Sequence, residues 1–261
     1  MGILNVTPDS FSDGGNFVSA DSSYKQVSKM LDEGASIIDV GGESTRPGAA
    51  PVGVAEELDR VIPVIERIAS EFDVTISIDT SKAEVMSAAV AAGAHIINDV
   101  RALREPDALE TAATLGVPVC LMHMLGEPRQ MQLNPQYADV VADVKTFLLT
   151  RVEACVQAGI KRDNIWLDPG FGFGKTLEHN LQLMHGLETF QDLGLPVLVG
   201  VSRKSMIAKM LDDRSVDDRL FASLSLATIA LMKGARILRV HDVRATMDAL
   251  VVAQCVLRAG N

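Results

Sequence analysis

The sequence predicts a single α/β domain over residues 1–261, folded as a closed (β/α)8 TIM barrel, and three observations support this prediction. The length of 261 residues is common for such barrels. The composition is 48% hydrophobic but only 4% aromatic, which is typical of the aliphatic core around a parallel sheet. The third observation is a repeat, in which a helical pattern ends at a glycine and an aliphatic run follows, at Gly34, Gly93, Gly116, Gly159, Gly194 and Gly234.

Eight aliphatic runs are the expected strands, and successive runs stand roughly 20–45 residues apart, the length of one strand-plus-helix unit. They are Ile3–Val6, Ser36–Val40, Val74–Asp79, His95–Asp99, Val117–Met122, Ile165–Asp168, Val197–Gly200 and Ala235–Val240. Helical patterns separate them: a helix is expected over Ala108–Leu115, and Ser81-x-x-Glu84 is typical of a capping box. No linker interrupts the units, which favours a closed barrel over the alternative, an open doubly wound sheet.

Charge and cysteine content exclude several classes of protein. The net charge is −10 and no basic stripe is present, so nucleic acid is not an expected partner. The three cysteines, Cys120, Cys155 and Cys255, contain no CxxC pair and are expected to be buried thiols in a reducing compartment. No signal peptide opens the chain, and the nearly uncharged run Leu220–Met232 is too short to span a bilayer. We therefore expect a cytoplasmic protein with no membrane partner.

Polar residues follow nearly every expected strand at its carboxyl end. They are Asn5, Asp39 with Glu43, Asp79, Asn98 with Asp99, Met122 with His123, Asp168, Ser202-Arg203-Lys204, and Arg239 with His241 and Asp242. Because these ends of barrel strands face one mouth, the pattern favours an active site over a plain scaffold. The stretch Asp168–Thr176 adds a glycine-rich loop that can pass close to a flat ligand, although an ordinary tight turn is the alternative. It misses the Walker loop and the dinucleotide fingerprint by one residue each.

The expected mouth divides by charge. Asp79, Asn98 and Asp168 would present acceptors to a flat heterocycle that carries amino and ring N–H donors. The alternative is that they are structural helix caps, which is the interpretation we prefer for Asp99.

Opposite these acceptors, Lys204, Arg239 and His241 follow strands seven and eight, where barrels commonly hold phosphate, with Asn5 beside strand eight. A helix that begins at Ser205 would add its N–H groups for an anion. A surface lysine and a core histidine are the alternatives for Lys204 and His241. Two long connections, Thr7–Ser19 and Gly41–Pro51, are expected to close over substrate unless they are merely mobile surface loops.

Six motifs, in this order along the chain, resemble the signatures of the dihydropteroate synthase family. They are Met1–Gly15 (which contains Asn-Val-Thr-Pro-Asp-Ser-Phe-Ser-Asp-Gly-Gly), Asp39–Gly48 (Asp-Val-Gly-Gly-Glu-Ser-Thr-Arg-Pro-Gly), Ile96–Asp99, Asp168–Lys175, Ser202–Ser205 and Arg239–Asp242. The resemblance implies a transferase of folate synthesis that uses Mg²⁺ and is a target of sulfonamides. Such an enzyme joins 6-hydroxymethyl-7,8-dihydropterin diphosphate to 4-aminobenzoate and gives 7,8-dihydropteroate and diphosphate.

The resemblance also implies a role for each matching residue. The pterin would be held by Asp79, Asn98, Asp168 and Lys204, beside Met122 and Gly200. The diphosphate would be held by Asn5, which also contacts Mg²⁺, and by Arg239 and His241. Aminobenzoate would lie among Phe11, Thr45, Pro47, Phe173, Lys204 and Ser205, with Asp13 and Arg46 arriving on the closing loops. The chemistry would fall to Asp79, Asp168, Lys204, Arg239 and His241.

The family is thought to react dissociatively, so that diphosphate departs before the amine attacks a cationic pterin methylene. Its members usually have further residues before the first strand, whereas Met1 already lies in the motif here, so we expect the shorter start to cost stability. The family is typically dimeric, and Leu220–Met232 has no charge on any helical face, so a homodimer through this helix is expected.

Three other functions remain open at this point. The first is the related methyltetrahydrofolate–corrinoid methyl transfer, which Lys204, Ser205 and the Thr45-Arg46-Pro47 loop disfavour. The second is a Schiff-base aldolase that uses Lys204, which borohydride trapping with substrate would detect. The third is a non-catalytic pterin-binding protein, which would bind pterin without turnover.

Overall fold

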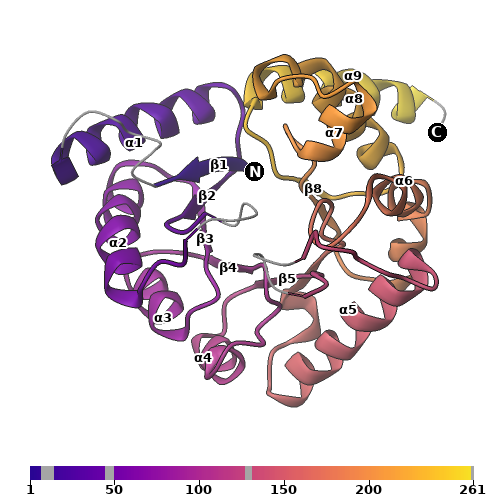
Figure 1. Ribbon diagram of the computed structural model, residues 1–261. Helices are drawn as coiled ribbons and strands as arrows, with labels where there is room; N and C mark the ends of the chain where they lie inside the picture. The colour runs from indigo at the N-terminus through magenta and orange to yellow at the C-terminus, as the bar shows by residue number, and fades with distance from the viewer. Residues whose placement is uncertain (7–14, 45–49, 127–130, 260–261) are drawn as a thin grey trace.

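The computed structural model describes residues 1–6, 15–44, 50–126 and 131–259, in which parallel strands form a central barrel inside a ring of helices (Figure 1). The strands are β1 (Gly2–Asn5), β2 (Ile37–Gly41), β3 (Thr75–Asp79), β4 (Ile96–Asp99), β5 (Val119–Met122), β6 (Ile165–Asp168), β7 (Leu198–Val199) and β8 (Ile237–Leu238). The helices are α1 (Gly15–Asp32), α2 (Val54–Glu71), α3 (Ala83–Ala91), α4 (Ala108–Leu115), α5 (Val140–Gln157), α6 (Leu177–His185), α7 (Ser205–Met210), α8 (Leu220–Met232) and α9 (Val243–Ala259). Short 3-10 helices lie at η2 (Arg162–Asn164), η3 (Leu187–Leu193) and η4 (Val216–Asp218).

Hydrogen bonds close the strands into a ring. β1 to β6 form one parallel sheet in sequence order, and β7 pairs with β8. The bridges Leu167↔Val197 and Gly2↔Val240 join these two sheets at both seams. At the second seam, the Ile3 amide also donates to the Val240 carbonyl at 3.0 Å. The predicted (β/α)8 barrel is therefore confirmed, and the open sheet is excluded.

The last two strands are shorter than predicted. β7 and β8 have two residues each, whereas the sequence predicts Val197–Gly200 and Ala235–Val240. The amides of Arg236 and Ile237 both donate to the Val197 carbonyl, at 2.9 and 3.2 Å. Because one acceptor serves two successive residues, the regular ladder is interrupted there.

Alternation along the strands sends apolar side chains toward the helices and polar ones into the barrel. The side chains on the helix-facing side are fully buried and include Ile38, Val40, Ile76, Ile78, Ile97 and Leu121. The alternate positions include Asp39, Ser77 and Asn98, which are also buried. The barrel interior thus contains buried polar and charged side chains.

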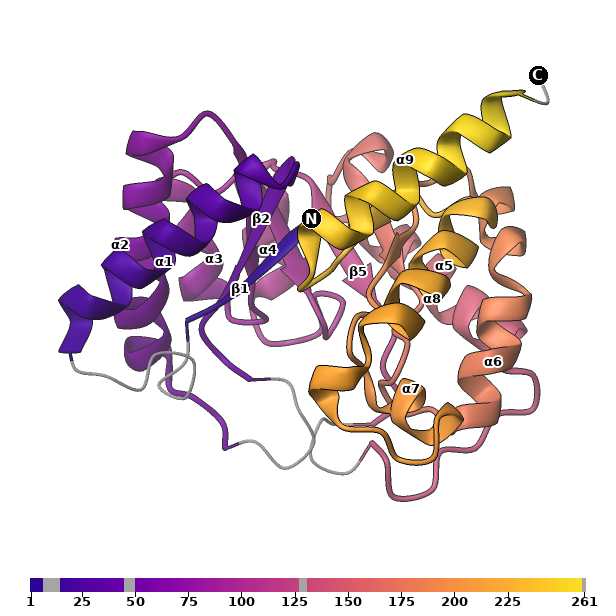
Figure 2. The ribbon, with the colours of Figure 1, turned by 90° about the horizontal axis from the view of Figure 1, so that it is seen from above.

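The repeat that predicted the fold is a series of helix ends. All six of its glycines have positive φ, between +68° and +116°, and the expected helix over Ala108–Leu115 is confirmed as α4. In the view of Figure 2, α1 to α4 lie on one side of the barrel, and α9 begins beside the chain's N-terminus and packs on α8.

Two local expectations are wrong. The N-cap of α3 is Lys82 without a side-chain cap, because the Ser81 hydroxyl donates to the Asp99 carboxylate instead of capping the helix. Cys255 is exposed on α9, whereas Cys120 and Cys155 are the buried thiols that we expected.

Within the described ranges, no helix combines the length and the apolar character that crossing a membrane requires.

Candidate active site

The register of the strands places the expected site residues side by side at the carboxyl ends of neighbouring strands. Asn5 pairs with Gly41, Gly41 with Asp79, and Asp79 with Asn98, from β1 across to β4. Farther around the ring, Met122 at the end of β5 pairs with Asp168 at the end of β6. All these strands are parallel, so their carboxyl ends open at one mouth of the barrel.

Arg239, which follows β8, lies at the centre of this mouth. Its Nε donates to Asp39 Oδ2 at 2.6 Å, and one of its terminal nitrogens donates to Asp79 Oδ2 at 2.7 Å. The same Asp39 oxygen accepts from Asn98 Nδ2 at 3.2 Å. Gly200 lies alongside, since a Cβ there would be 3.8 Å from Arg239 Cβ. One hydrogen-bonded cluster therefore contains three expected site residues and Asp39, and a fourth expected residue, Gly200, lies beside it.

Sequence analysis expected Arg239 to lie opposite the acceptor residues at the mouth. Instead, its guanidinium contacts one of those acceptors, Asp79, directly. Sequence analysis placed Asp39 at a strand end but gave it no role in the site. The available signal was a carboxylate inside the aliphatic run Ile37–Val40, since a buried charge requires a partner.

Burial and nearby negative charges make Asp79 a weaker acid than an ordinary aspartic acid. Its pKa is raised to about 7, because burial disfavours the carboxylate and the nearby Asp39, Asp99 and Glu57 add repulsion, although Arg239 opposes the shift. Burial lowers the pKa of Arg239, but the attraction of Asp39 and Asp79 outweighs it and raises the value overall. The guanidinium therefore keeps its positive charge.

Asp168 begins the glycine-rich loop and is buried. Its Oδ1 accepts from the Gly170 amide at 2.7 Å, and burial raises the pKa of its carboxyl while Lys204 opposes the shift. Gly170 has φ +71°, and a Cβ there would come within 1.8 Å of the His123 carbonyl oxygen. A glycine is required at position 170 because the backbone after β5 passes directly against it.

Lys204 closes the mouth from the side of β7. Its Nζ donates to the Phe171 carbonyl and lies 4.3 Å from the centroid of the Phe173 ring. Burial lowers the pKa of Lys204 to about 8, although the charge of Asp168 opposes this shift. It is therefore not the solvated surface lysine of the alternative interpretation.

Phe173 packs against an apolar cluster of Val100, Met122, Met124 and Met131. This cluster gives the mouth one apolar wall beside the charged residues. It includes Met122, which sequence analysis expected to line the pterin pocket.

A second lysine, Lys175, binds carbonyl groups of the glycine-rich loop. Sequence analysis did not identify it as a site residue. Its side chain is 2% exposed, and Nζ lies 2.9 Å from His123 Nδ1, 2.9 Å from the Gly170 carbonyl and 3.1 Å from the Phe173 carbonyl. Burial lowers the pKa of His123 to about 3, so its ring is neutral and Nδ1 can accept. Burial also lowers the pKa of Lys175 to about 7. Its position directly after three spaced glycines was the available signal.

The remaining expected residues lie at the rim or beyond the described residues. His241 is half-buried and its Nδ1 lies 3.1 Å from Ser202 Oγ, while Ser205 is exposed and begins α7. Phe11, Asp13, Thr45, Arg46 and Pro47 fall outside the described ranges.

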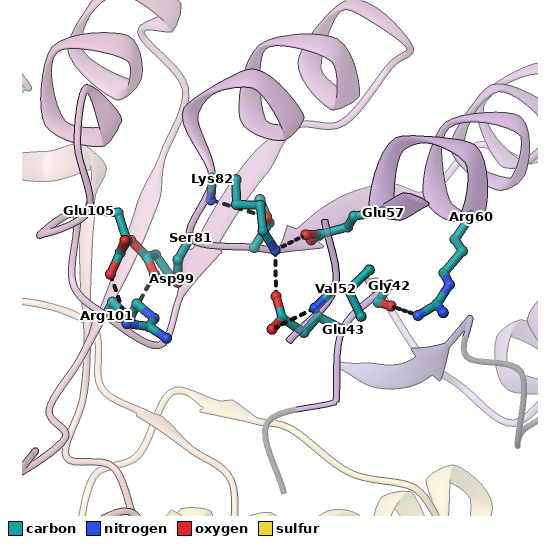
Figure 3. Close-up of polar contacts among 11 residues, drawn as sticks. Gly42, Glu43, Val52, Glu57, Arg60, Ser81, Lys82, Asp99, Arg101 and Glu105 are labelled. Carbon is teal, nitrogen blue, oxygen red and sulfur yellow. Dashed lines mark hydrogen bonds and ion pairs between the residues drawn. The ribbon is translucent and has the colours of Figure 1, made fainter. Parts of the chain in front are cut away.

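Asp99 has a structural role, but it is not the helix cap that we expected, because Asp107 is the N-cap of α4. Its carboxylate accepts from the Ser81 hydroxyl and from the amides of Arg101 and Leu103, at 2.8 and 2.7 Å for the amides. Figure 3 shows it facing Ser81.

A family model described as pterin binding enzyme matches residues 1–241. The chain is 57% identical to the dihydropteroate synthase of Haemophilus influenzae over 259 residues, which cover 99% of this chain and 94% of that protein. The chain belongs to the pterin-binding enzyme family.

Solved structures of family members agree with this assignment. The Yersinia pestis dihydropteroate synthase, crystallised in a sulfonamide drug complex, superposes with a TM-score of 0.94 at 52% identity, over 98% of this chain and 93% of that one. The Xanthomonas albilineans dihydropteroate synthase with 4-aminobenzoic acid superposes with a TM-score of 0.93 at 50% identity, over 98% of this chain and 92% of that one.

Replacing Gly170 by alanine tests the close approach in the loop. Gly194→Ala is the matched control, because Gly194 has a similar φ of +68° but no atom within 4 Å of a new Cβ. The control is expected to cost about 1 kcal/mol of unfolding free energy from left-handed strain alone. Gly170→Ala is expected to cost about 3 kcal/mol or more, because a backbone oxygen must also move. Urea unfolding measures both, and equal costs would contradict the proposed clash.

Proposed function

We propose that this chain catalyses the dihydropteroate synthase reaction. It transfers the pterinylmethyl group of 6-hydroxymethyl-7,8-dihydropterin diphosphate to the amine of 4-aminobenzoate and releases diphosphate. The observation that carries the proposal is the arrangement of charges at the mouth, where the carboxylates of Asp79 and of the buried Asp168 lie with the cations Arg239 and Lys204. The chain's 57% identity to a dihydropteroate synthase supports the choice of reaction within the family.

The pterin would lie in the mouth over the acceptor row. The carboxylates of Asp79 and Asp168 would accept from its amino and ring N–H groups, with Asn98 beside them. Lys204 would contact the ring from the side of β7, and Met122 and Gly200 would line the pocket. A hydrophobic wall with a few converging polar groups suits a flat heterocycle.

The diphosphate would lie toward β8 and β1, where Arg239, His241 and Asn5 follow the strands. Arg239 can bind two phosphate oxygens through its planar fork. Its pairing with Asp39 orients the guanidinium before substrate arrives.

Magnesium fits the mouth through Asn5 and the diphosphate. Mg²⁺ usually binds one or two protein oxygens together with substrate phosphates and waters. No group of three His, Cys, Asp or Glu side chains within the described ranges could hold a metal ion alone. Asn5 Oδ1 lies beside Gly41, near Asp79, and would be the protein ligand. When bound there, Mg²⁺ would offset the charge of the diphosphate.

Aminobenzoate would lie beside Phe173 and Lys204, with its carboxylate toward Ser205 and the start of α7. Phe11, Thr45 and Pro47 would complete this subsite, and Asp13 and Arg46 would come with the two long connections. Because sulfonamides resemble aminobenzoate, this subsite would also be where they bind.

The reaction needs no dedicated nucleophile. As the bond from the pterin methylene to diphosphate breaks, Arg239, His241 and Asn5 stabilise the departing anion, and the carboxylates of Asp79 and Asp168 stabilise the cationic pterin. The arylamine is neutral near pH 7 and attacks the methylene directly, and the proton that its nitrogen then loses passes to the departing diphosphate or to water. Exclusion of water prevents hydrolysis of the cation.

We also propose a homodimer through α8, in the cytoplasm. Phe221 and Met232 of α8 are 80% and 60% exposed, and Val252 and Val256 of the adjacent α9 are 65% and 67% exposed. Exposed apolar side chains on two helices that pack together are typical of an interface. The free thiols suit a reducing compartment, and cell fractionation tests this location.

Diphosphate release measures the proposed reaction. With pterin diphosphate and Mg²⁺, wild type should release diphosphate only when 4-aminobenzoate is added. Asp168→Asn should lower kcat/KM about 100-fold or more, because a charge that stabilises the cation is lost. Asp163→Asn, at an exposed position, should leave the rate unchanged. Pterin binding without any diphosphate release would sink the proposal and favour a non-catalytic pterin-binding protein.

Pterin affinity should depend on pH through Asp79. As pH falls through about 7, Asp79 takes up a proton and loses its capacity as a charged acceptor. Calorimetric titration with 6-hydroxymethylpterin should show weakening that approaches about tenfold per pH unit below this value. Asp79→Asn should bind weakly at every pH, without that slope. A wild-type affinity that stays constant from pH 5 to 8 would contradict this assignment.

Light scattering tests the dimer. Wild type at micromolar concentration should have twice the monomer mass, and Phe221→Asp should be monomeric because a charge would be buried at the interface. Leu133→Asp is the control, since Leu133 is 78% exposed and lies outside α8 and α9. A wild-type monomer would exclude the proposed interface.

A further inference from the structure

One peptide group beside Lys204 is bound by side chains on both of its sides. It is the trans peptide that joins Phe171 to Gly172 in the glycine-rich loop. Its N–H donates to Asn180 Oδ1 at 2.7 Å, and its C=O accepts from Lys204 Nζ. Because a trans peptide is planar, with its N–H and C=O pointing in opposite directions, the side chain that binds one of these groups also orients the other. Asn180 has no part in the mechanism above.

This peptide is the middle one of a tight turn. The Phe173 amide donates to the Gly170 carbonyl at 3.1 Å, so the turn runs over residues 170–173. Gly172, at its third position, has φ +81°, which is typical of a type II turn. A type I turn differs from it by rotation of the middle peptide, which reverses the direction of the carbonyl. Because glycine adopts either sign of φ, Gly172 alone does not choose between the two orientations.

The two ends of the turn are held by a different side chain. Lys175 Nζ donates to the carbonyls of Gly170 and Phe173, at 2.9 and 3.1 Å. These hydrogen bonds fix where the turn lies, but they do not determine which way its middle carbonyl faces. The orientation of the middle peptide therefore depends on Asn180 and Lys204.

Asn180 is itself a fixed group. Its side chain is 2% exposed on α6, and its Nδ2 donates to the carbonyls of Thr176 and Lys175, at 2.6 and 3.4 Å. A capping box between Thr176 and His179 fixes the first turn of α6, from which Asn180 projects. Since Nδ2 faces two carbonyl oxygens, Oδ1 is the atom that faces the Gly172 amide.

Lys204, in contrast, is half-buried and lies along the turn. A Cβ on Gly172 would be 3.1 Å from Lys204 Cδ, and Nζ lies 4.3 Å from the centroid of the Phe173 ring. Lys204 is the N-cap of α7, which packs beside α6. The Phe171 carbonyl and the Phe173 ring thus set the position of the ammonium group at the mouth.

We propose that Asn180 is a positioning residue for Lys204. It holds the middle peptide of the turn in the orientation that directs the Phe171 carbonyl at the Lys204 ammonium group. The proposal rests on the proposed function, in which Lys204 contacts the pterin. Asn180 acts on the pterin through Lys204, whereas a residue that merely stabilises α6 would affect pterin binding independently of Lys204, or not at all.

Asn180→Leu and Asn180→Asp separate these two roles. Leucine has nearly the same shape but no acceptor for the Gly172 amide. Aspartate keeps an oxygen for that amide and loses the donor that binds the carbonyls in α6 and before it. Asn164→Leu is the matched control, because Asn164 precedes β6 and donates to the Gly116 carbonyl at the opposite end of the barrel.

Crystal structures without substrate test the positioning directly. In Asn180→Leu, the middle peptide should be reversed in all or part of the molecules, with negative φ at Gly172 and no contact between the Phe171 carbonyl and Lys204 Nζ. In Asn180→Asp, it should keep the wild-type orientation. A wild-type orientation in Asn180→Leu, or a reversed one in Asn180→Asp, would overturn the proposal. The aspartate variant carries the test if the leucine variant does not fold.

Pterin affinity gives a second test, in which Asn180→Leu is combined with Lys204→Met. Calorimetric titration with 6-hydroxymethylpterin at one pH should show about tenfold weaker binding for Asn180→Leu than for wild type, because a charged contact is displaced. In the Lys204→Met background, the same change should weaken binding by about twofold at most, since no ammonium group remains to be positioned. Equal losses in both backgrounds would contradict the proposal.

The crystal structures also distinguish failure of this proposal from failure of the proposed function, because they contain no substrate. If wild type releases no diphosphate but the peptide is reversed in Asn180→Leu, the proposed function fails and the positioning of Lys204 stands. If wild type is an active synthase but the peptide keeps its orientation in Asn180→Leu, the positioning role alone fails. Asn164→Leu should match wild type in both measurements.

Discussion

The buried pairing of Arg239 with Asp39 and Asp79 is the interaction on which the site depends. A lone charge inside an aliphatic barrel would cost several kcal/mol, so each member requires the others. Asp39 Oδ2 accepts from both Arg239 and Asn98, which means that one oxygen orients two residues that are far apart in the sequence. The weak acidity of Asp79 follows from the same crowding, since burial and neighbouring carboxylates raise its pKa to about 7.

The fold could be predicted because its determinants are local. Aliphatic runs and helix-ending glycines depend only on neighbouring residues, and all eight strands begin and end within two residues of their predicted bounds. β7 and β8 were predicted too long because their irregular pairing depends on Val197, a residue some forty positions away from its partners. The capping box failed for a similar reason, since Asp99 from the next strand takes the Ser81 hydroxyl.

The site could be predicted as a set of strand ends but not as a set of contacts. The rule that barrel strands open at one mouth was enough to select Asp79, Asn98, Asp168 and Arg239. It could not pair Arg239 with Asp39, because 200 residues separate them in the sequence. Lys175 was missed because its three acceptors come from the backbone and from a histidine 52 residues away, which no motif records.

The seam between β1 and β8 determines when the barrel can close during synthesis. Gly2 bridges Val240, so the first strand emerging from the ribosome has no second neighbour until nearly the whole chain is made. Arg239 stands directly beside that seam and reaches Asp39 only when the ring closes. The residue that completes the barrel and the cation at the mouth are therefore synthesised together, because Arg239 and Val240 are neighbours in the chain.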